Sequence, residues 1–335
     1  MIIFAFVAGL IAVALLYQTF GAYRDAKRFP ALGRVIDVGP CRLHLNVQGA
    51  GSPTVVLESG IAASSLSWAL VQPEIAKFTR VAGYDRAGLG WSQRCSVSRT
   101  VEQMILEMSS LLSKAGLRSP YILVGHSFGG LLVRAYANLK PNDVVGLVLV
   151  DPVSVEYWAN CGKNDLRRLQ LGTKFSRRGA VLARFGIVRA TLDILASGGR
   201  KFPKLIARAS AGRGTTVLEN MVGQVQKLPP EVWPMIRAHW SRSGAFLAMA
   251  GYLAALPESA RAALHMPIPS HIPLMILSAS TATEQELKER DSWIQQSERG
   301  THIRLNDCGH WIQLEQPEAV IAAVRELIEG ALSKR

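Results

Sequence analysis

A serine flanked by small residues stands where the sequence could present it as a nucleophile. Ser127 is the centre of Gly125-His126-Ser127-Phe128-Gly129, which directly follows the apolar run 121–124 and precedes a helix-forming stretch. A G-x-S-x-G pattern between a strand and a helix is typical of a nucleophile elbow, a turn that exposes the serine hydroxyl. Because the turn is tight, the flanking residues must be small. We therefore predict that Ser127 is a catalytic nucleophile.

The chain as a whole has the composition of a folded protein. It has 335 residues, of which 49% are hydrophobic and 19% are charged, and its 29 glycines follow no fixed repeat. These values exclude a disordered chain, a coiled coil and a collagen-like fibre. A single α/β domain with an insertion reaches this length, so we expect one large core.

The elements that must position the serine can be read from residue patterns. After Pro30, short runs rich in β-branched residues alternate with helical patterns, which predicts a largely parallel sheet covered by helices. The expected strands are 34–38, 42–47, 54–58, 79–84, 121–124, 144–150, 273–277 and 302–305. The first two are expected to pair antiparallel. Helices are expected after Thr100, over 128–139 and 284–296, and after Pro317, and Thr100 and Gln103 have the spacing of a capping box.

Between residues 152 and 270 this alternation stops, and helix-forming segments are separated by glycines and prolines. We therefore predict an inserted helical cap over 152–270 and a core made of 34–151 and 271–335. The cap holds 17 Lys and Arg residues against 6 Asp and Glu residues, an excess of 11 positive charges in a chain whose total is +13. A cap that faces an anionic membrane surface would explain this concentration of charge.

Residues 1–23 carry no charged side chain and are mostly apolar. As a helix they would extend about 34 Å, enough to cross a hydrocarbon core of about 30 Å. No cation precedes the apolar run and no convincing cleavage site follows it, which favours an uncleaved transmembrane anchor over a signal peptide. A basic linker, 24–33, comes next. Because its cations follow the anchor, we expect a single-pass membrane protein with a cytoplasmic catalytic domain.

Cysteine spacing and charge distribution bear on cofactors and partners. Cys41, Cys95, Cys161 and Cys308 lie too far apart in sequence for a metal-ligand motif or a small disulfide framework, so we expect no metal and no cofactor. The positive residues of the cap are not interleaved with aromatic ones, and no element that reads nucleic acid is visible. The expected partners are a small-molecule ester or lipid-like substrate and a membrane, and no nucleic acid.

Several motifs together resemble those of the α/β-hydrolase superfamily, over nearly all of residues 35–333. Besides the serine motif, they are a turn at Gly60, the segment Tyr84-Asp85-Arg86-Ala87-Gly88-Leu89-Gly90-Trp91-Ser92, and Gly309-His310 late in the chain. The resemblance implies an α/β-hydrolase fold, with a mostly parallel central sheet flanked by helices and an inserted helical cap. Two positions depart from the pattern: Ser59 replaces the usual histidine before Gly60, and the usual acid position after strand 273–277 is not filled.

The resemblance assigns the catalytic base to His310, which would take the proton of Ser127. Two residues are candidates for the acid that orients this histidine. Asp151 ends the strand 144–150 and fits the chain order serine, acid, histidine. Glu284 lies close to the position that most of the superfamily uses, one strand later. We choose Asp151 and keep Glu284 as the alternative.

By the same resemblance, the backbone N–H groups of Ile61 and Phe128 form the oxyanion hole. Trp68 and Trp91 are candidates for lining the substrate pocket. Asp85 has glycine-rich surroundings, so we expect it to organise its loop. His126, which is adjacent to the nucleophile in the chain, is expected to shape the elbow and not to act as the base.

We therefore expect a serine hydrolase that cleaves a carboxylic ester, on an apolar small-molecule or lipid-like substrate, through an acyl-enzyme. Peptidase, thioesterase, C–C-bond hydrolase and acyltransferase activities use the same triad and stay open. Epoxide hydrolases and haloalkane dehalogenases of this fold carry Asp in place of the serine, so their chemistry is disfavoured. A catalytically silent ligand-binding protein of the same fold is a further alternative, against which the presence of both Ser127 and His310 argues.

Overall fold

A single mixed sheet forms the centre of the molecule, in a computed structural model that describes residues 1–197 and 224–332. Its eight strands have the order β1-β2-β4-β3-β5-β6-β7-β8. They are β1 (Arg34–Asp37), β2 (Arg42–Gln48), β3 (Thr54–Glu58), β4 (Val81–Tyr84), β5 (Tyr121–His126), β6 (Val144–Val150), β7 (Leu274–Ser278) and β8 (Gly300–Arg304). β2 pairs antiparallel with β1 and β4, and the other neighbours are parallel. The mostly parallel sheet expected from the sequence is confirmed.

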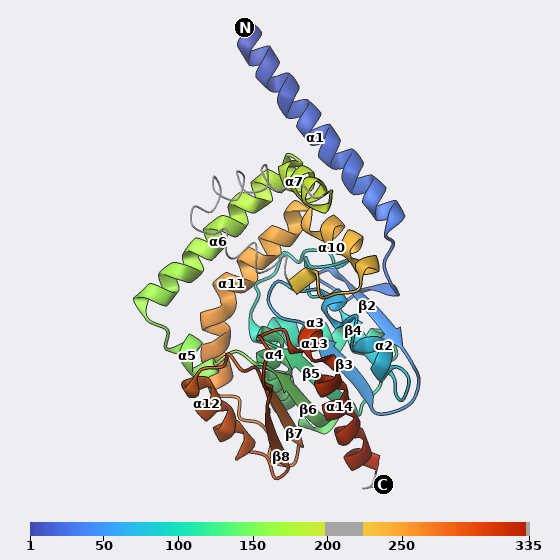
Figure 1. Cartoon of the computed structure of the whole chain (residues 1–335), viewed down its shortest axis with the longest axis vertical. Coiled ribbons are helices and arrows are strands. Elements are labelled where there is room, and N and C mark those ends of the chain that lie inside the picture. The colour runs from blue at the N-terminus through green and yellow to red at the C-terminus, as the bar shows by residue number, and fades with distance from the viewer. Residues whose placement is uncertain (198–223, 333–335) are drawn as a thin grey trace.

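Helices cover both faces of the sheet, because its central strands are apolar on both sides. All residues of β3 and β5 are buried. One face packs against α3 (Val101–Lys114), α4 (Phe128–Leu139) and α12 (Glu284–Ile294). The other packs against α2 (Gln72–Ile75), α13 (Ile312–Glu315) and α14 (Pro317–Leu332), as Figure 1 shows. The sheet is thus enclosed between two helical layers.

The helix starts follow the capping rules in part. The Thr100 side chain accepts a hydrogen bond from the N–H of Gln103 over 3.2 Å, as expected for an N-cap. The Gln103 side chain donates to Glu107 and does not complete the expected box. A complete box occurs instead at α12, where Thr283 and Glu286 bond reciprocally.

In the segment 152–270, which was expected to form the cap, the described residues form helices joined by turns and no strand. The segment contains α5 (Val155–Ala159), α6 (Lys163–Arg184), α7 (Ile187–Ala196), a 3₁₀ turn (Pro230–Val232), α10 (Trp233–Trp240) and α11 (Ser243–Leu264). α11 packs along α5 and α6 and also contacts α3 and α4, so it joins the cap to the core (Figure 1). The part of the expected cap at 198–223 lies outside the described residues.

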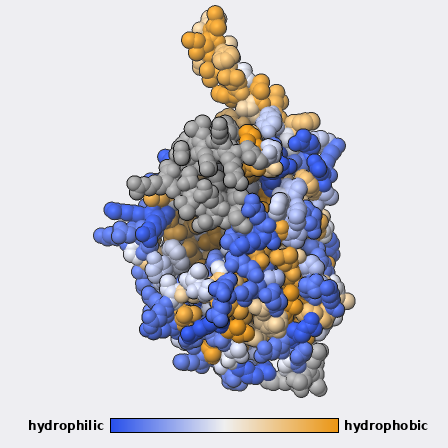
Figure 2. Space-filling view, in the orientation of Figure 1, coloured by the Kyte–Doolittle hydropathy of each residue, from blue (hydrophilic) through white to orange (hydrophobic). Residues whose placement is uncertain are grey.

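The N-terminal helix α1 (Ile2–Arg28) projects from the body as an apolar rod (Figures 1 and 2). Among the residues described, it is the one helix long and apolar enough to cross a membrane, and the mean hydropathy of its most apolar window is 2.2. Its last turns pack on the cap: Gln18 donates to the carbonyl of Ser241 over 2.9 Å, and Arg189 pairs with Asp25 over 2.5 Å. Residues 24–28 of the expected linker are therefore helical.

A disulfide joins Cys41, which precedes β2, to Cys95 in the loop after β4, and the two Cα atoms are 5.1 Å apart. The pair is separated by 54 positions and was not expected from the sequence. A backbone hydrogen bond brings the two cysteine-bearing segments together: the N–H of Gln93 donates to the carbonyl of Arg42 over 2.9 Å. Cys161 and Cys308 are free thiols.

Candidate active site

Ser127 lies in a strained turn between β5 and α4. Its backbone angles are φ 55° and ψ −120°, with a positive φ that residues other than glycine rarely adopt. Two glycines permit the close approaches of this turn: a Cβ on Gly125 would lie 2.5 Å from the carbonyl oxygen of Gly129, and one on Gly129 would lie 2.4 Å from that of Glu58. Ser127 remains partly exposed at the carboxyl edge of the sheet. The turn has the geometry expected of a nucleophile elbow.

His310 and Asp151 are brought together from 159 positions apart. Nδ1–H of His310 donates to Oδ2 of Asp151 over 2.6 Å. The side chain of His310 is 45% exposed and that of Asp151 is 7% exposed. Glu284 instead lies at the start of α12, is 82% exposed and pairs with Lys288 over 2.8 Å. Of the two candidate acids, the structure places Asp151 against the histidine and leaves Glu284 in solvent.

The carboxylate of Asp151 is held on both oxygens. Oδ1 accepts hydrogen bonds from Arg290 over 2.8 Å and from the N–H of Ala279 over 3.1 Å. Burial would raise the pKa of Asp151, but the hydrogen bond from His310 and the charge of Arg290 outweigh it, so the pKa lies below its usual value. Sequence reasoning missed Arg290, since no motif marks it and it reaches Asp151 across 139 positions.

His126 links the elbow to the loop that carries His310. Its Nε2–H donates to the backbone carbonyl of His310 over 2.8 Å, and the two rings lie with centroids 4.7 Å apart. Burial lowers the pKa of His126 to about 3, so this ring is neutral near pH 7. The contact fits the shaping role expected from the sequence.

The segment that carries Ile61 lies against the nucleophile, because a Cβ on Gly60 would stand 3.4 Å from the Cβ of Ser127. Arg86 holds this segment by donating to the carbonyl oxygens of residues 59, 60 and 61 over 2.5, 2.5 and 3.2 Å. Phe128 is the first residue of α4, where an N–H group has no acceptor within the helix. Both amides expected in the oxyanion hole therefore belong to segments beside Ser127.

Arg86 is buried and pairs with an acid, Glu58, next to residues 59–61, which we call the oxyanion segment. Its guanidinium forms an ion pair with Glu58, whose carboxylate also accepts a hydrogen bond from the Tyr84 hydroxyl. The same guanidinium lies over the Tyr252 ring, 4.9 Å from its centroid. The sequence motif contained Arg86 but did not indicate this supporting role.

Asp85 organises the neighbouring loop, as expected. One of its oxygens accepts a hydrogen bond from the N–H of Ser65 over 2.6 Å, and the other accepts one from the N–H of Trp91 over 3.0 Å. The second oxygen also lies 2.7 Å from Nδ1 of His44, and neither side chain of this pair is exposed. Asp85 is thus a structural acid below the oxyanion segment.

The two tryptophans expected at the substrate pocket have other contacts. Trp68 has no exposed surface with which to touch a substrate, and its indole N–H donates to the hydroxyl of Ser59 over 3.1 Å. Trp91 donates to the carbonyl of Phe29 over 3.0 Å and packs edge-on against His239, with centroids 4.4 Å apart. The structure gives Trp68 a packing role and ties Trp91 to the linker that follows α1.

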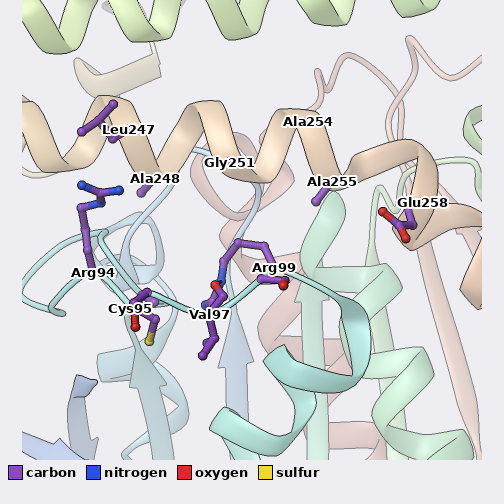
Figure 3. Close-up of a pocket in the computed structure, with 13 residues that line it drawn as sticks. Arg94, Cys95, Val97, Arg99, Leu247, Ala248, Gly251, Ala254, Ala255 and Glu258 are labelled. Atoms are coloured by element: carbon purple, nitrogen blue, oxygen red, sulfur yellow. Dashed lines mark hydrogen bonds between the residues drawn. The ribbon is translucent and has the colours of Figure 1, made fainter. Parts of the chain in front are cut away.

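A cleft of about 430 Å³ lies between residues 94–99 and α11 (Figure 3). Its lining consists of Ala87, Arg94, Cys95, Ser96, Val97, Ser98, Arg99, Leu247, Ala248, Gly251, Ala254, Ala255 and Glu258, and so contains no member of the expected triad. Within the described ranges, one group of possible metal ligands gathers, namely Cys41, Cys95 and Glu107. Its two sulfurs are bonded to each other, so this group is not a metal site.

Comparison with known proteins identifies the family. The chain matches the model of the Alpha/beta hydrolase family over residues 55–323. It is 33% identical over 130 residues to the 2-hydroxy-6-oxo-2,4-heptadienoate hydrolase of Pseudomonas putida, a match to 38% of this chain and 46% of that protein. It is 32% identical over 131 residues to the 2-hydroxymuconate semialdehyde hydrolase of a Pseudomonas species, covering 38% and 46% of the two chains. The chain thus spans less than half the length of these curated relatives.

Solved structures share the fold at low identity. The epoxide hydrolase CorEH superposes with a TM-score of 0.63 at 17% identity, over 89% of this chain and 98% of that one. An esterase from Thermogutta terrifontis superposes with a TM-score of 0.52 at 21% identity, over 87% and 94% of the two chains. At these identities the likeness concerns the fold. The family match over residues 55–323, most of the chain's length, shows that the chain belongs to the α/β-hydrolase family.

Proposed function

We propose that this protein is a serine hydrolase that cleaves a carboxylic ester through Ser127, His310 and Asp151. The proposal rests on the 2.6 Å hydrogen bond from His310 Nδ1 to Asp151 Oδ2, in a loop bonded to the elbow of Ser127 through His126. This bond fixes the tautomer of His310, so that Nε2 of the neutral ring can accept a proton. In the described part of the chain, no hydrogen bond occupies that nitrogen.

The reaction would proceed in two halves. His310 takes the proton of Ser127 while the serine oxygen attacks the ester carbonyl; the bond to the alcohol then breaks, and His310 protonates the departing oxygen. Water next gives a proton to His310 and attacks the acyl-enzyme, which releases the acid and returns the proton to Ser127. Asp151 stays ionised throughout and stabilises the imidazolium that forms in each half.

The negative charge on the carbonyl oxygen would be bound by the N–H groups of Ile61 and Phe128. Such a donor contributes about 3 to 4 kcal/mol when it is fixed before the reaction. Arg86 supports this fixation because it binds three successive carbonyl oxygens of the segment that carries Ile61. The donors then need no reorganisation as the charge develops.

Hydrolysis of a dienoate or semialdehyde substrate, as stated in the names of the two Pseudomonas relatives, is the second candidate. These relatives are 33% and 32% identical to this chain within their aligned segments, and each alignment covers 46% of the relative's length. The likeness to an epoxide hydrolase supports the fold and not that chemistry, since epoxide hydrolases of this fold use Asp where this chain has Ser127. Ester hydrolysis is therefore our first choice.

A fluorophosphonate probe tests the proposal, because it reacts with activated serines only. The wild type should be labelled, and Ser127→Ala should not. Turnover is then measured on p-nitrophenyl esters of rising chain length, on a peptide series and on a 2-hydroxy-6-oxo-dienoate. An unlabelled wild type rejects the serine mechanism. Labelling without ester turnover, combined with cleavage of the dienoate, selects the second candidate.

We further propose that α1 remains attached as a membrane anchor. Arg189 is 4% exposed in its side chain and finds its partners on α1, namely Asp25 and the Gln18 side-chain oxygen at 3.1 Å. α1 also covers this side chain, since a Cβ on Gly21 would lie 2.6 Å from the Arg189 guanidinium, so removal of α1 would break the ion pair and uncover this part of the cap. The mature protein should therefore keep its original N-terminus and resist alkaline extraction from membranes. An N-terminus beyond residue 23 would show that the segment is a cleaved signal.

The outer face of α6 supports contact of the cap with anionic lipid. α6 has seven Lys and Arg residues against one acid, and it contacts α1. One exposed stripe along the helix contains three cations and two apolar side chains, namely Arg167, Leu171, Lys174, Arg178 and Val181. Such a stripe is typical of a helix that lies in the headgroup region of a bilayer.

Hydrogen exchange of the full chain in nanodiscs tests this contact. Amides of α6 should exchange more slowly in anionic than in neutral nanodiscs, and high salt should abolish the difference because it screens the charges. The variant Arg167→Glu with Arg178→Glu should lose the effect, whereas Lys114→Glu on α3 should keep it. Equal exchange in both lipids would show that α6 faces water.

The side of the membrane is a separate question. Cations after α1 favour a cytoplasmic domain, whereas the Cys41–Cys95 disulfide favours an oxidising compartment. We propose the non-cytoplasmic side, because long domains often cross regardless of flanking charge. Cys161 is a free, partly exposed thiol, so an impermeant maleimide should label it in intact cells and should not label Cys161→Ser. Labelling only after lysis would place the domain in the cytoplasm.

A further inference from the structure

Arg290 binds Asp151, the acid of the expected triad, on the oxygen that does not face His310. It lies on α12, and its side chain is 3% exposed. One terminal nitrogen donates to Asp151 Oδ1 and to the Ser278 hydroxyl, each over 2.8 Å, and the other donates to the carbonyl of Pro152 over 2.8 Å. A planar guanidinium held at three points has little freedom to turn. It therefore constrains whatever it binds.

Asp151 needs such a constraint because of where it lies. It follows β6 directly and has a positive φ of 41°. Its side chain could turn unless both oxygens were bound, and Oδ2 must face Nδ1 of His310 for the base to keep its tautomer. Arg290 and the N–H of Ala279 both bind Oδ1. They leave Oδ2 as the oxygen directed at the histidine.

Arg290 also changes the charge that His310 meets. Within the described ranges, Asp151 is the one acid that pairs with Arg290. The positive guanidinium offsets part of the negative charge that the carboxylate presents to His310. The His126 ring lies against that of His310 and also feels the charge of Arg86. Cys308, two positions before His310, lies near Glu318 and the ion pair of Glu315 with Lys227.

We propose that Arg290 is a positioning residue for the catalytic acid: it fixes Asp151 so that one oxygen faces His310, and its charge offsets part of the charge of that carboxylate. The proposal rests on the triad proposed above. It predicts two separable effects of substitution, one on the rate at the pH optimum and one on the acid side of the pH profile.

The measurement is the second-order rate of fluorophosphonate labelling of the full chain as a function of pH, accompanied by kcat and KM for an ester substrate. Arg290→Gln removes the positive charge and the two terminal guanidinium nitrogens that donate hydrogen bonds. Its plateau rate should fall about 10- to 100-fold with little change in KM, because the acid is no longer held in place. The pH at which its labelling rate falls in acid should move about one unit upward. Without the positive charge of residue 290, Asp151 stabilises the protonated, inactive base more strongly.

Two variants separate positioning from general damage. Arg290→Lys keeps the positive charge but loses the paired nitrogens of the guanidinium. Its plateau rate should therefore fall, while the acid side of its pH profile should stay at the wild-type pH. Arg304→Gln removes an exposed arginine that pairs with Asp291 over 2.8 Å and does not touch Asp151; its profile should match the wild type. Circular dichroism verifies that each variant folds. If Arg290→Gln does not fold, Arg290→Lys still decides, since a wild-type plateau rate in it would overturn the proposal.

Failure of this inference can be told from failure of the proposed function. If the wild type is not labelled at all, the serine mechanism is rejected and Arg290 has no acid to position. If the wild type is labelled, Ser127→Ala is not, and a folded Arg290→Gln keeps both the plateau rate and the acid side of the pH profile, then the triad stands and the role of Arg290 is rejected.

Discussion

Among the histidine–aspartate pairs of the described residues, two with a buried aspartate lie in different regions of the molecule. At the edge of the sheet, Nδ1 of His310 is 2.6 Å from Asp151, and beneath the linker that follows α1, Nδ1 of His44 is 2.7 Å from Asp85. The pairs differ at the other ring nitrogen. Nε2–H of His44 donates to the carbonyl of Leu32 over 2.8 Å, and the ring is fully buried. Nε2 of His310 has no partner in the part of the chain described, and that side chain is 45% exposed.

This difference separates a structural pair from one that can do chemistry. Both nitrogens of His44 lie close to acceptor oxygens. Burial would lower the pKa of His44, but the contact with Asp85 outweighs burial and raises it above its ordinary value. The pKa of Asp85 is lowered by the same contact, against its own burial. His44 is fully buried with an oxygen beside each ring nitrogen, so it has no free nitrogen with which to accept a proton from a substrate. A short distance to an aspartate is therefore not enough to identify a catalytic histidine.

The largest expected effect comes from removing either reactive group. Ser127→Ala and His310→Ala should each lower kcat by about 10⁶-fold, because members of a triad act as a unit. The unfolding midpoint should hardly change. His44→Ala is the matched comparison, and it should do the reverse, lowering stability strongly while folded molecules keep most of their activity. Similar kinetic losses in both histidine variants would remove the distinction between the pairs.

The acids should differ almost as much. Asp151→Asn should lower kcat about 10⁴-fold, since the amide cannot stabilise the imidazolium and favours the wrong tautomer. Glu284→Gln removes an exposed carboxylate that pairs only with Lys288 among the described residues, so its kcat should equal that of the wild type. Ester turnover at saturating substrate measures both. The opposite ranking would transfer the role of the acid to Glu284.

Asp85→Asn should act on stability and not on the chemical step. It removes a buried carboxylate that contacts His44 and accepts hydrogen bonds from the N–H groups of Ser65 and Trp91, which should cost about 3 to 5 kcal/mol of unfolding free energy. Denaturant unfolding of the full chain in detergent measures the loss, with Glu284→Gln as the control for a surface carboxylate. A loss below about 1 kcal/mol, as for an exposed pair, would contradict the structural role.

The smallest effect is a dependence of stability on pH. The pKa of His44 is raised from its ordinary value of 6.5, so its stabilising contribution is complete below that value and is lost as the pH rises through the folded-state pKa. The difference in unfolding free energy between the wild type and His44→Gln should therefore be largest near about pH 5.5 and shrink in alkaline solution. A difference that grows with pH would show that the ring is buried in its neutral form.

The sequence predicted those parts of the site that are encoded locally. The elbow of Ser127 needs a strand, two glycines and a helix within a few residues, and all of them can be read from adjacent positions. The alternation of strands and helices likewise follows from short patterns, so nearly every strand was expected within a residue or two of its place. A periodic apolar pattern carries this information because each face of an element is buried as a whole.

Contacts between distant segments could not be predicted in the same way. Asp151 and Glu284 were both plausible acids, because nothing in the sequence states which of them approaches His310. Arg290 and the bond between Cys41 and Cys95 were missed for the same reason. Arg86 was noticed only as part of a motif, since its hold on residues 59–61 depends on how two loops meet. These relations arise from tertiary packing, which a single sequence does not record.

The docking of α1 on the cap bears on how the enzyme would meet its substrate. Arg189 binds α1, and Trp91 binds the carbonyl of Phe29 just after the helix ends. The helix is therefore fixed to the rest of the chain and is not connected to it through a flexible linker alone. In a bilayer the domain would stay at a fixed height and orientation and search by lateral diffusion. Substrates that partition into the membrane would reach it in two dimensions and at high local concentration. Selectivity would then be set in part by solubility in the membrane, before any side chain of the site is touched.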